Sequence, residues 1–136
     1  MRFTTRIMLL AAIATSVAAV GVGAASAWTG GLTVDPKATL LHDRTQVIAS
    51  GTVACQEGDL VEVDANVGEV VGRIGRYARG FTNVECTGAE QPWSIVMTAL
   101  TPNVHLLPGP ANVYAQAFDL YDYSFTAMYG QVLLVR

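Results

Sequence analysis

The sequence has little positive charge and few of the residue types that build catalytic or metal centres. Its 8 Lys and Arg residues are outnumbered by 11 Asp and Glu residues, which gives a net charge of −3. Nucleic acid is not an expected partner, because binding it normally needs a positive field that displaces counterions. The 2 histidines, His42 and His105, lie outside any HExxH or GxSxG pattern, and we expect both to be solvated loop residues. We predict no catalytic residue, no metal and no cofactor.

The amino-terminal segment has the pattern of a secretory signal peptide. Two arginines precede a charge-free stretch over residues 7–24, and the small residues Ala25-Ser26-Ala27 follow it. We predict a signal over residues 1–27, cleavage between Ala27 and Trp28, and a secreted, extracellular protein. The alternative is an uncleaved anchor, since the apolar run approaches the roughly 18 to 20 residues of a spanning helix. In the favoured interpretation the protein meets a membrane only through the signal, before cleavage.

Cleavage would leave residues 28–136 as one domain, which we expect to be a monomer. The six basic residues outside the signal minus the eleven acids give this segment a net charge of −5. Cys55 and Cys86 are the 2 cysteines of the chain, and no CxxC spacing indicates a metal site. In an exported protein they predict a structural disulfide, although two buried free thiols are the alternative. The chain-entropy model gives such a crosslink roughly 3 to 4 kcal/mol of stabilisation.

Helix-period patterning is nearly absent after Trp28, whereas period-two alternation recurs between Gly, Pro, Asp and Asn. The alternation is clearest over residues 60–67, where the valines and Ala65 face inward. Residues 72–80, broken by glycines, are expected to be a loop or irregular edge. The predicted strands are 32–34 with 38–41, 46–55, 60–67, 81–86, 93–98, 111–120 and 131–135. About seven short strands predict an all-β, immunoglobulin-like β-sandwich, with a small barrel as the alternative.

Four short motifs occur in the order found in a known family: Leu32–Pro36, Gly51–Cys55, Cys86–Gly88 with Trp93, and Pro108–Ala111. In this respect the chain resembles small exported bacterial proteins of actinobacterial type that carry an immunoglobulin-like domain of unknown function. The resemblance covers nearly all of residues 28–136. It implies the sandwich fold and the disulfide, and it brings no catalytic residues with it.

The segment from Asp119 to Phe125 is unusually aromatic for a hairpin tip. The candidate binding residues are Tyr121, Tyr123 and Phe125, with Asp119 and Asp122 as hydrogen-bond acceptors. Further rings lie nearby at Tyr114, Phe118 and Tyr129. Aromatic side chains at such a tip can stack on sugar rings or anchor a protein partner. The alternative is that several of these rings simply complete the core.

Carboxylates are concentrated over residues 57–64, at Glu57, Asp59, Glu62 and Asp64. Hard oxygen ligands of this kind can hold calcium. A solvated strand face is the favoured interpretation, because Glu62 and Asp64 alternate with core valines.

Basic side chains are concentrated at Arg73, Arg76 and Arg79. They could meet an anionic surface such as a cell-wall polymer, or they could keep a sheet edge from pairing with another chain. The second interpretation is favoured, because the spacing does not place all three on one strand face.

These observations together predict a non-enzymatic binding or adhesion module that acts at or beyond the cell surface. The expected ligand is a cell-wall polymer or a protein. A structural or inhibitor-like exported protein is the first alternative. An extracellular hydrolase is the second, and it lacks a recognisable nucleophile and base in the sequence.

Overall fold

The computed structural model describes residues 30–136, so the predicted signal peptide and its cleavage site lie outside the described residues. Strands account for 68% of the described residues and helices for none, which confirms the all-β prediction. Within the same residues, no helix is long and apolar enough to cross a membrane.

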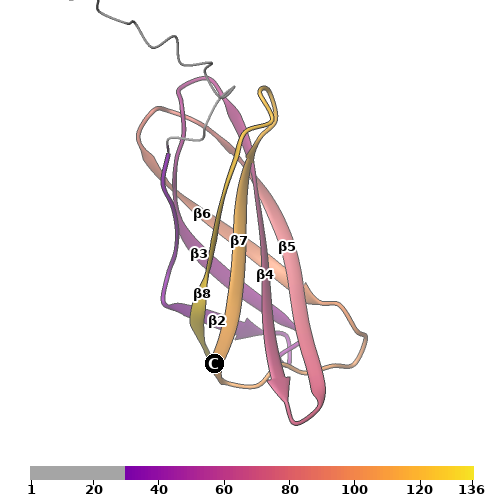
Figure 1. Cartoon of the computed structure of the whole chain (residues 1–136). Helices are drawn as coiled ribbons and strands as arrows, with labels where there is room; N and C mark the ends of the chain where they lie inside the picture. The colour runs from indigo at the N-terminus through magenta and orange to yellow at the C-terminus, as the bar shows by residue number, and fades with distance from the viewer. Residues whose placement is uncertain (1–29) are drawn as a thin grey trace, which may run out of the picture.

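Eight strands form one continuous hydrogen-bonded sheet that closes on itself (Figure 1). Their bounds are β1 Leu32–Val34, β2 Lys37–Leu41, β3 Gln46–Ala54, β4 Leu60–Val71, β5 Ile74–Glu85, β6 Glu90–Ala99, β7 Gly109–Asp119 and β8 Phe125–Val135. The ring runs β3-β2-β8-β7-β4-β5-β6 and returns to β3, and β1 pairs with the far end of β3. All these pairs are antiparallel except β2–β8, which is parallel.

The closed seven-strand barrel corrects the prediction of an immunoglobulin-like sandwich. A sandwich has two sheets with free edges, whereas here β3 pairs with β6 from Gln46 to Ala54 and with β1 and β2 on its other edge. The break between β1 and β2 falls at Asp35-Pro36, where proline cannot donate to the ladder. Inward and outward residues alternate identically in a sandwich and a barrel, so the sequence pattern could not separate them.

The expectation of a loop or irregular edge over residues 72–80 was wrong. Only the turn at Gly72 and Arg73 is irregular, and β5 then pairs with β4 from Ile74 to Glu85. The chain's closing strand is also longer than predicted, because β8 pairs with β7 from Phe125 onward. The β4–β5 and β7–β8 hairpins are joined through the β4–β7 pairing and form one half of the barrel.

The barrel interior is filled mainly by valine and alanine. The inward positions predicted on the strand over 60–67 are buried. Val47, Ala49 and Val53 of β3 are buried as well, and so are Trp93, Ile95 and Met97 of β6. Trp93 donates its indole N–H to the Thr52 carbonyl at 3.2 Å, so its polar atom is satisfied. Small residues on β4 and β7 leave room inside the barrel for these larger side chains.

One end of the barrel is closed by the connection between β6 and β7. Leu106 of this connection is fully buried, and Glu69 inside the barrel accepts the Leu107 amide at 2.8 Å. Arg76 donates to the His105 carbonyl at 2.8 Å, while the His105 ring bonds to the Asp43 carbonyl. Both predicted loop histidines therefore lie at this end, His42 in an exposed turn and His105 in the connection.

The predicted disulfide between Cys55 and Cys86 is confirmed. Cys55 directly follows β3 and Cys86 directly follows β5, so the bond joins the two strands that flank β6 in the ring, at the end that carries the β7–β8 hairpin tip. Both cysteines are buried.

Candidate binding face

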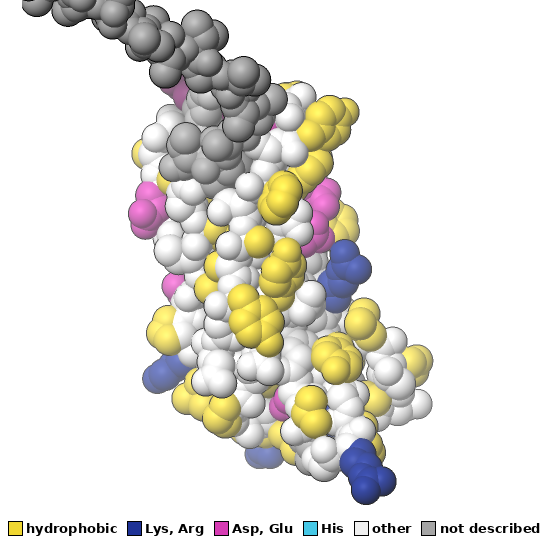
Figure 2. Space-filling model, in the orientation of Figure 1, with side chains coloured by type: hydrophobic (Ala, Val, Ile, Leu, Met, Phe, Trp, Pro, Cys, Tyr) yellow, Lys and Arg dark blue, Asp and Glu magenta, His cyan; other side chains and the backbone are white. Residues whose placement is uncertain are grey.

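Aromatic side chains are concentrated on one outer surface of the barrel. We call the outward side chains of β5, β4, β7 and β8, with the tip of the β7–β8 hairpin, the aromatic face. Every aromatic residue among residues 30–136 except Trp93 lies on it. Figure 2 looks onto this face and shows yellow hydrophobic side chains spread down its length between white polar ones, with the basic side chains toward its margins.

The rings repeat at a spacing of four residues on three of the strands. The pairs are Tyr77 and Phe81 on β5, Tyr114 and Phe118 on β7, and Phe125 and Tyr129 on β8. Four residues of a strand span roughly 13 Å. Cross-strand register places Tyr114 beside Tyr129 and Phe118 beside Phe125. The face thus has a tyrosine tier (Tyr77, Tyr114, Tyr129) and a phenylalanine tier (Phe81, Phe118, Phe125), the latter nearer the hairpin tip.

Amide side chains lie between the rings of the tyrosine tier. Asn66 is the register partner of Tyr114, while Asn112 and Gln131 pair with each other in the neighbouring row. Asn66, Asn112 and Gln131 are exposed. Each can donate and accept hydrogen bonds at the surface.

Tyr77 lies flat on the sheet because two glycines make room for its ring. A Cβ built on Gly68, its cross-strand partner, would lie 2.8 Å from the ring carbons Cδ1 and Cε1. A Cβ on Gly75 would lie 2.6 Å from the ring carbon Cε2. Ordinary side chains at these two positions would tilt the ring away from the backbone. One face of the Tyr77 ring is therefore held against the strands, and the side chain is half exposed.

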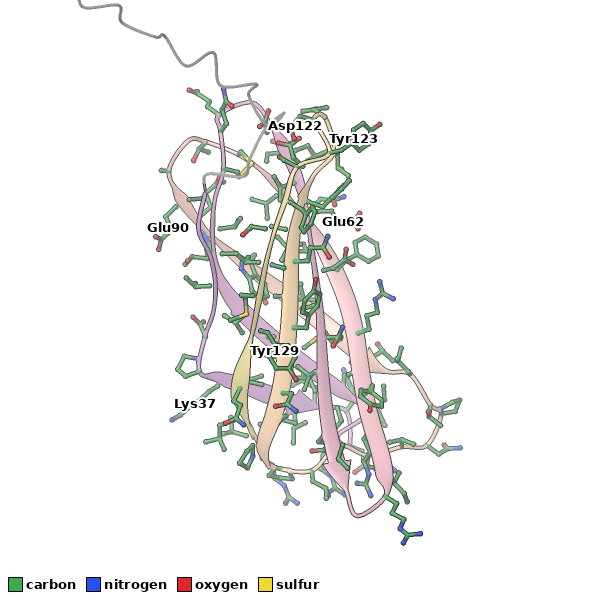
Figure 3. The ribbon with its side chains drawn as sticks, in the orientation of Figure 1. Lys37, Glu62, Glu90, Asp122, Tyr123 and Tyr129 are labelled. Carbon is green, nitrogen blue, oxygen red and sulfur yellow. A yellow bond between two sulfur atoms is a disulfide. The ribbon has the colours of Figure 1, made fainter. Side chains whose placement is uncertain are left out.

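A shallow hollow of about 270 Å³ opens beside this ring. It forms where Gly68 provides no side chain between Tyr77 and Asn112 in the same cross-strand row. Its walls include Asn66, Gly68, Tyr77, Asn112, Tyr114 and Tyr129. Figure 3 labels Tyr129 on β8, in the middle of this face.

The predicted hairpin-tip residues lie above the phenylalanine tier. Tyr121, Tyr123 and Phe125 are exposed, at 65%, 73% and 59%, so these rings are outside the core. Tyr123 reaches back to Phe118 with ring centroids 5.9 Å apart, and its φ of 63° places it in the left-handed region. The tip therefore extends the aromatic face beyond the barrel, as the label of Tyr123 in Figure 3 shows.

Asp119 and Asp122 shape the tip in different ways. Asp119 is only 2% exposed, and its Oδ1 accepts the backbone amides of Tyr121 at 2.8 Å and Asp122 at 3.2 Å. Asp122 is exposed and accepts both the hydroxyl and the amide of Ser124. These hydrogen bonds lower the pKa of Asp122. Asp119 thus builds the turn, and Asp122 is the acceptor that lies at the surface.

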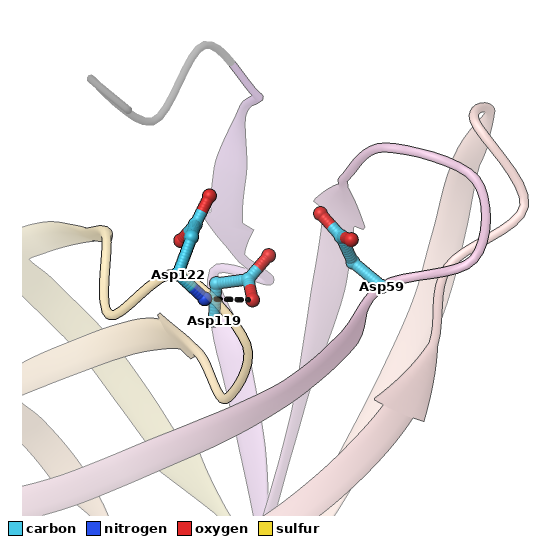
Figure 4. A group of neighbouring side chains, drawn as sticks. All are labelled: Asp59, Asp119 and Asp122. Carbon is cyan, nitrogen blue, oxygen red and sulfur yellow. Dashed lines mark hydrogen bonds between the residues drawn. The ribbon is translucent and has the colours of Figure 1, made fainter. Parts of the chain in front are cut away.

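Asp59 joins these two residues from the start of β4 (Figure 4). One ligand atom from each of the three carboxylates lies within 4.8 Å of the others, so the trio could hold a cation such as calcium. The pKa of Asp59 is raised, chiefly by a hydrogen bond with the Asp119 carboxyl, and further by desolvation and by the charges of Asp119 and Asp122. Of the four carboxylates that the sequence analysis considered as calcium ligands over residues 57–64, only Asp59 belongs to this trio.

The charged side chains on the face itself are few. Glu62 and Asp64 lie outward on β4, as predicted for a solvated strand face. The pKa of Glu62 is raised by desolvation and by the hydrogen bond and charge of Asp64, while Arg79 acts in the opposite direction. Arg79 is exposed on β5, whereas Arg76 turns inward to hold the β6–β7 connection. The arginines therefore do not share one surface. β5 pairs with β4 along its whole length, and its other edge pairs with β6 at Ala78 and Arg79.

Tyr77 and Phe81 are the members of this face that the sequence analysis missed. Phe81 begins the predicted strand over 81–86 but was not named as a binding residue, whereas the glycines at 72, 75 and 80 concealed the part of β5 that carries Tyr77. The available signal was the alternation from Gly75 through Tyr77, Arg79 and Phe81 to Asn83, which continues the outward face of a strand.

Comparison of the chain with models of known protein families finds no match, and comparison with curated proteins finds none either.

Proposed function

We propose that the protein is an exported, non-enzymatic binding module whose ligand lies on the aromatic face. One observation carries the proposal: among residues 30–136, every aromatic side chain but Trp93 is placed on a single outer surface. Exposed aromatic rings are unfavourable in water unless a partner covers them, and a concentration of them on one surface marks an interaction site. The disulfide and the amino-terminal signal pattern support an oxidising, extracellular place of action.

The hairpin tip provides a first test of this function. The double variant Tyr121→Ala with Tyr123→Ala removes two exposed rings, and Val96→Ala removes an exposed side chain from β6 as the matched control. Purified wild type and variants are passed over sensor surfaces that carry cell-wall polysaccharide, hyaluronate or gelatin. We expect at least one surface to retain the wild type and the control, and to lose most of the double variant.

Thermal unfolding of the same proteins separates binding from folding. We expect the melting temperature of the double variant to stay within a few degrees of the wild type, because surface substitutions usually change stability by less than about 0.5 kcal/mol. Retention that is equal for all three proteins, or absent from all surfaces, would refute the proposal. A structural or inhibitor-like role that does not use this face predicts one of those two results.

A further inference from the structure

We infer that the ligand of the aromatic face is an uncharged polysaccharide chain, and that one of its sugar rings stacks on Tyr77 in the hollow beside Gly68. The inference rests on the proposed function and names the chemistry of its ligand.

The orientation of Tyr77 favours a flat, ring-shaped ligand unit. The ring lies against the backbone at Gly68 and Gly75, so its opposite face is presented parallel to the sheet. An aromatic face is electron-rich and attracts C–H groups that carry partial positive charge. One face of a sugar ring offers a set of such C–H groups, and its hydroxyls point outward from the rim. Those hydroxyls would meet the amides of Asn66 and Asn112, which line the same hollow.

The hollow is large enough for one sugar unit of a longer ligand and too small to enclose a complete drug-sized molecule. Its volume of about 270 Å³ is below the roughly 300 to 1,000 Å³ of pockets that enclose a drug-sized molecule, and it is open to solvent. The phenylalanine tier repeats the aromatic surface roughly 13 Å further along the strands. A chain of linked rings can use both tiers at once, whereas a single small molecule cannot.

The lining of the hollow favours an uncharged chain. None of its lining residues is Lys, Arg, Asp, Glu or His. Anionic polymers are recognised through cationic side chains. Among the described residues of β4, β5, β7 and β8, Arg79 is the one basic residue whose side chain points outward. Glu62 and Asp64 lie nearby on β4 and would repel an anionic chain.

A folded protein partner fits this surface less well. The centre of a protein interface is a contiguous, desolvated cluster surrounded by a polar rim. Here amides lie within the tyrosine tier itself, at Asn66, Asn112 and Gln131, and glycine leaves a hollow where a central anchor would be needed. Rings interrupted by hydrogen-bonding groups match a ligand that alternates apolar ring faces with hydroxyls.

The test uses a substitution that tilts Tyr77 without removing it. Gly68→Ala places a Cβ where the ring now lies, and Tyr77→Ala removes the ring. The matched control is Gly130→Ala, in β8 of the same sheet, where a Cβ would meet nothing closer than the Met128 methyl at 3.7 Å. Purified proteins are titrated calorimetrically with soluble neutral polysaccharides (mannan, β-glucan, arabinogalactan and dextran), with hyaluronate and polygalacturonate, and with gelatin.

We expect at least one neutral polysaccharide to bind wild type and Gly130→Ala equally, and Gly68→Ala and Tyr77→Ala about 5- to 10-fold more weakly. The melting temperatures of all four proteins should agree within a few degrees, because positions 68 and 77 lie on the outer surface and a Cβ at position 130 meets no atom closer than 3.7 Å. Binding of hyaluronate, polygalacturonate or gelatin through the aromatic face, without binding of any neutral chain, would overturn the inference and leave the proposed function standing. A second outcome is that a neutral chain binds, that Gly68→Ala and Tyr77→Ala leave its affinity unchanged, and that the double variant at Tyr121 and Tyr123 weakens its binding. This result would overturn the inference and leave the proposed function standing. Absence of any binding that depends on the face would remove both.

Discussion

The two outer surfaces of the barrel share one interior yet differ in chemistry. The aromatic face carries rings, amides and few charges, whereas the outward residues of β3 and β6 are mainly Ser, Thr and small aliphatic side chains, such as the register partners Ser50 and Ser94. We call this second surface the plain face. Both surfaces cover the same core, which is rich in valine and alanine. The stability of that core therefore does not require aromatic side chains on the outer surface. The difference is what the proposed binding role predicts, because rings outside the barrel add little to the packing of its core.

The largest expected effect separates an inner ring from an outer one. Trp93→Ala should lower the free energy of unfolding by about 3 to 5 kcal/mol, because Trp93 is buried beneath the plain face. Tyr129→Ala, at 72% exposure on the aromatic face, should change it by less than about 0.5 kcal/mol. Urea unfolding measures both. Similar losses in the two variants would mean that the outer rings belong to the fold after all.

The disulfide is expected to have the next largest effect, because it links the two halves of the barrel. Replacing Cys55 and Cys86 by serine opens a crosslink between residues 31 apart in sequence. The expected loss is about 3 to 4 kcal/mol, measured by urea unfolding. The wild type unfolded in the presence of a reductant provides the control and should lose a similar amount. A loss below about 1 kcal/mol would indicate that strand pairing alone holds the two halves in place.

A smaller effect is expected from the carboxylate buried inside the aromatic half. Glu69→Ala leaves the Leu107 amide without its side-chain acceptor, at an expected cost of about 1 to 3 kcal/mol in unfolding free energy. Glu69→Gln retains an acceptor oxygen and should lose less. Equal losses in the two variants would show that the hydrogen bond to Leu107 does not matter for the closed end of the barrel.

The smallest effect concerns pH and the carboxylates at the hairpin end. The raised pKa of Asp59 means that the folded state binds its proton more tightly than the unfolded state does. Wild-type stability from this group therefore falls as the pH rises through the ordinary carboxyl range toward the raised pKa. Asp59→Asn should melt slightly higher than wild type at neutral pH, and the difference should vanish in acid below that range.

Asp122 provides a control of opposite sign. Its pKa is lowered by the Ser124 hydroxyl and amide, so its stabilising contribution is present at neutral pH and lost as the pH falls through the lowered value. Asp122→Asn should melt slightly lower than wild type at neutral pH, with a difference that shrinks in strong acid. Melting temperatures measured across pH test both variants. Changes of the same sign at neutral pH would contradict the causes given for the pKa shifts of Asp59 and Asp122.

The core was largely predictable because period-two alternation reports which side of a strand is buried. The inward residues of β4 and the Cys55–Cys86 pairing were predicted correctly. The closure of the ring was not, because it depends on long-range pairs such as Gln46 with Thr98 and Lys37 with Leu133. Local alternation carries no information about which strands become neighbours.

The candidate site was predictable only in part. The tip rings Tyr121, Tyr123 and Phe125 were identified from a local cluster of sequence. The meeting of Tyr77 with Asn112 across Gly68 was not, since it requires the register of three strands. The same holds for the approach of Asp59 to the turn around Asp119, which joins residues 60 apart (119 minus 59) in the chain.

The parallel pairing of β2 with β8 has a consequence for the order in which the chain folds. The edge of β2 finds its partner only in residues 133–135, nearly one hundred positions later. Closing such a long loop costs conformational entropy before the contacts between β2 and β8 can form. We therefore expect folding to be slow, with the β2–β8 pairing among its last steps. Until β8 docks, the early strands expose an unpaired edge. We therefore expect a compartment or chaperone that separates the unfolded chains to reduce their aggregation until β8 has paired with β2.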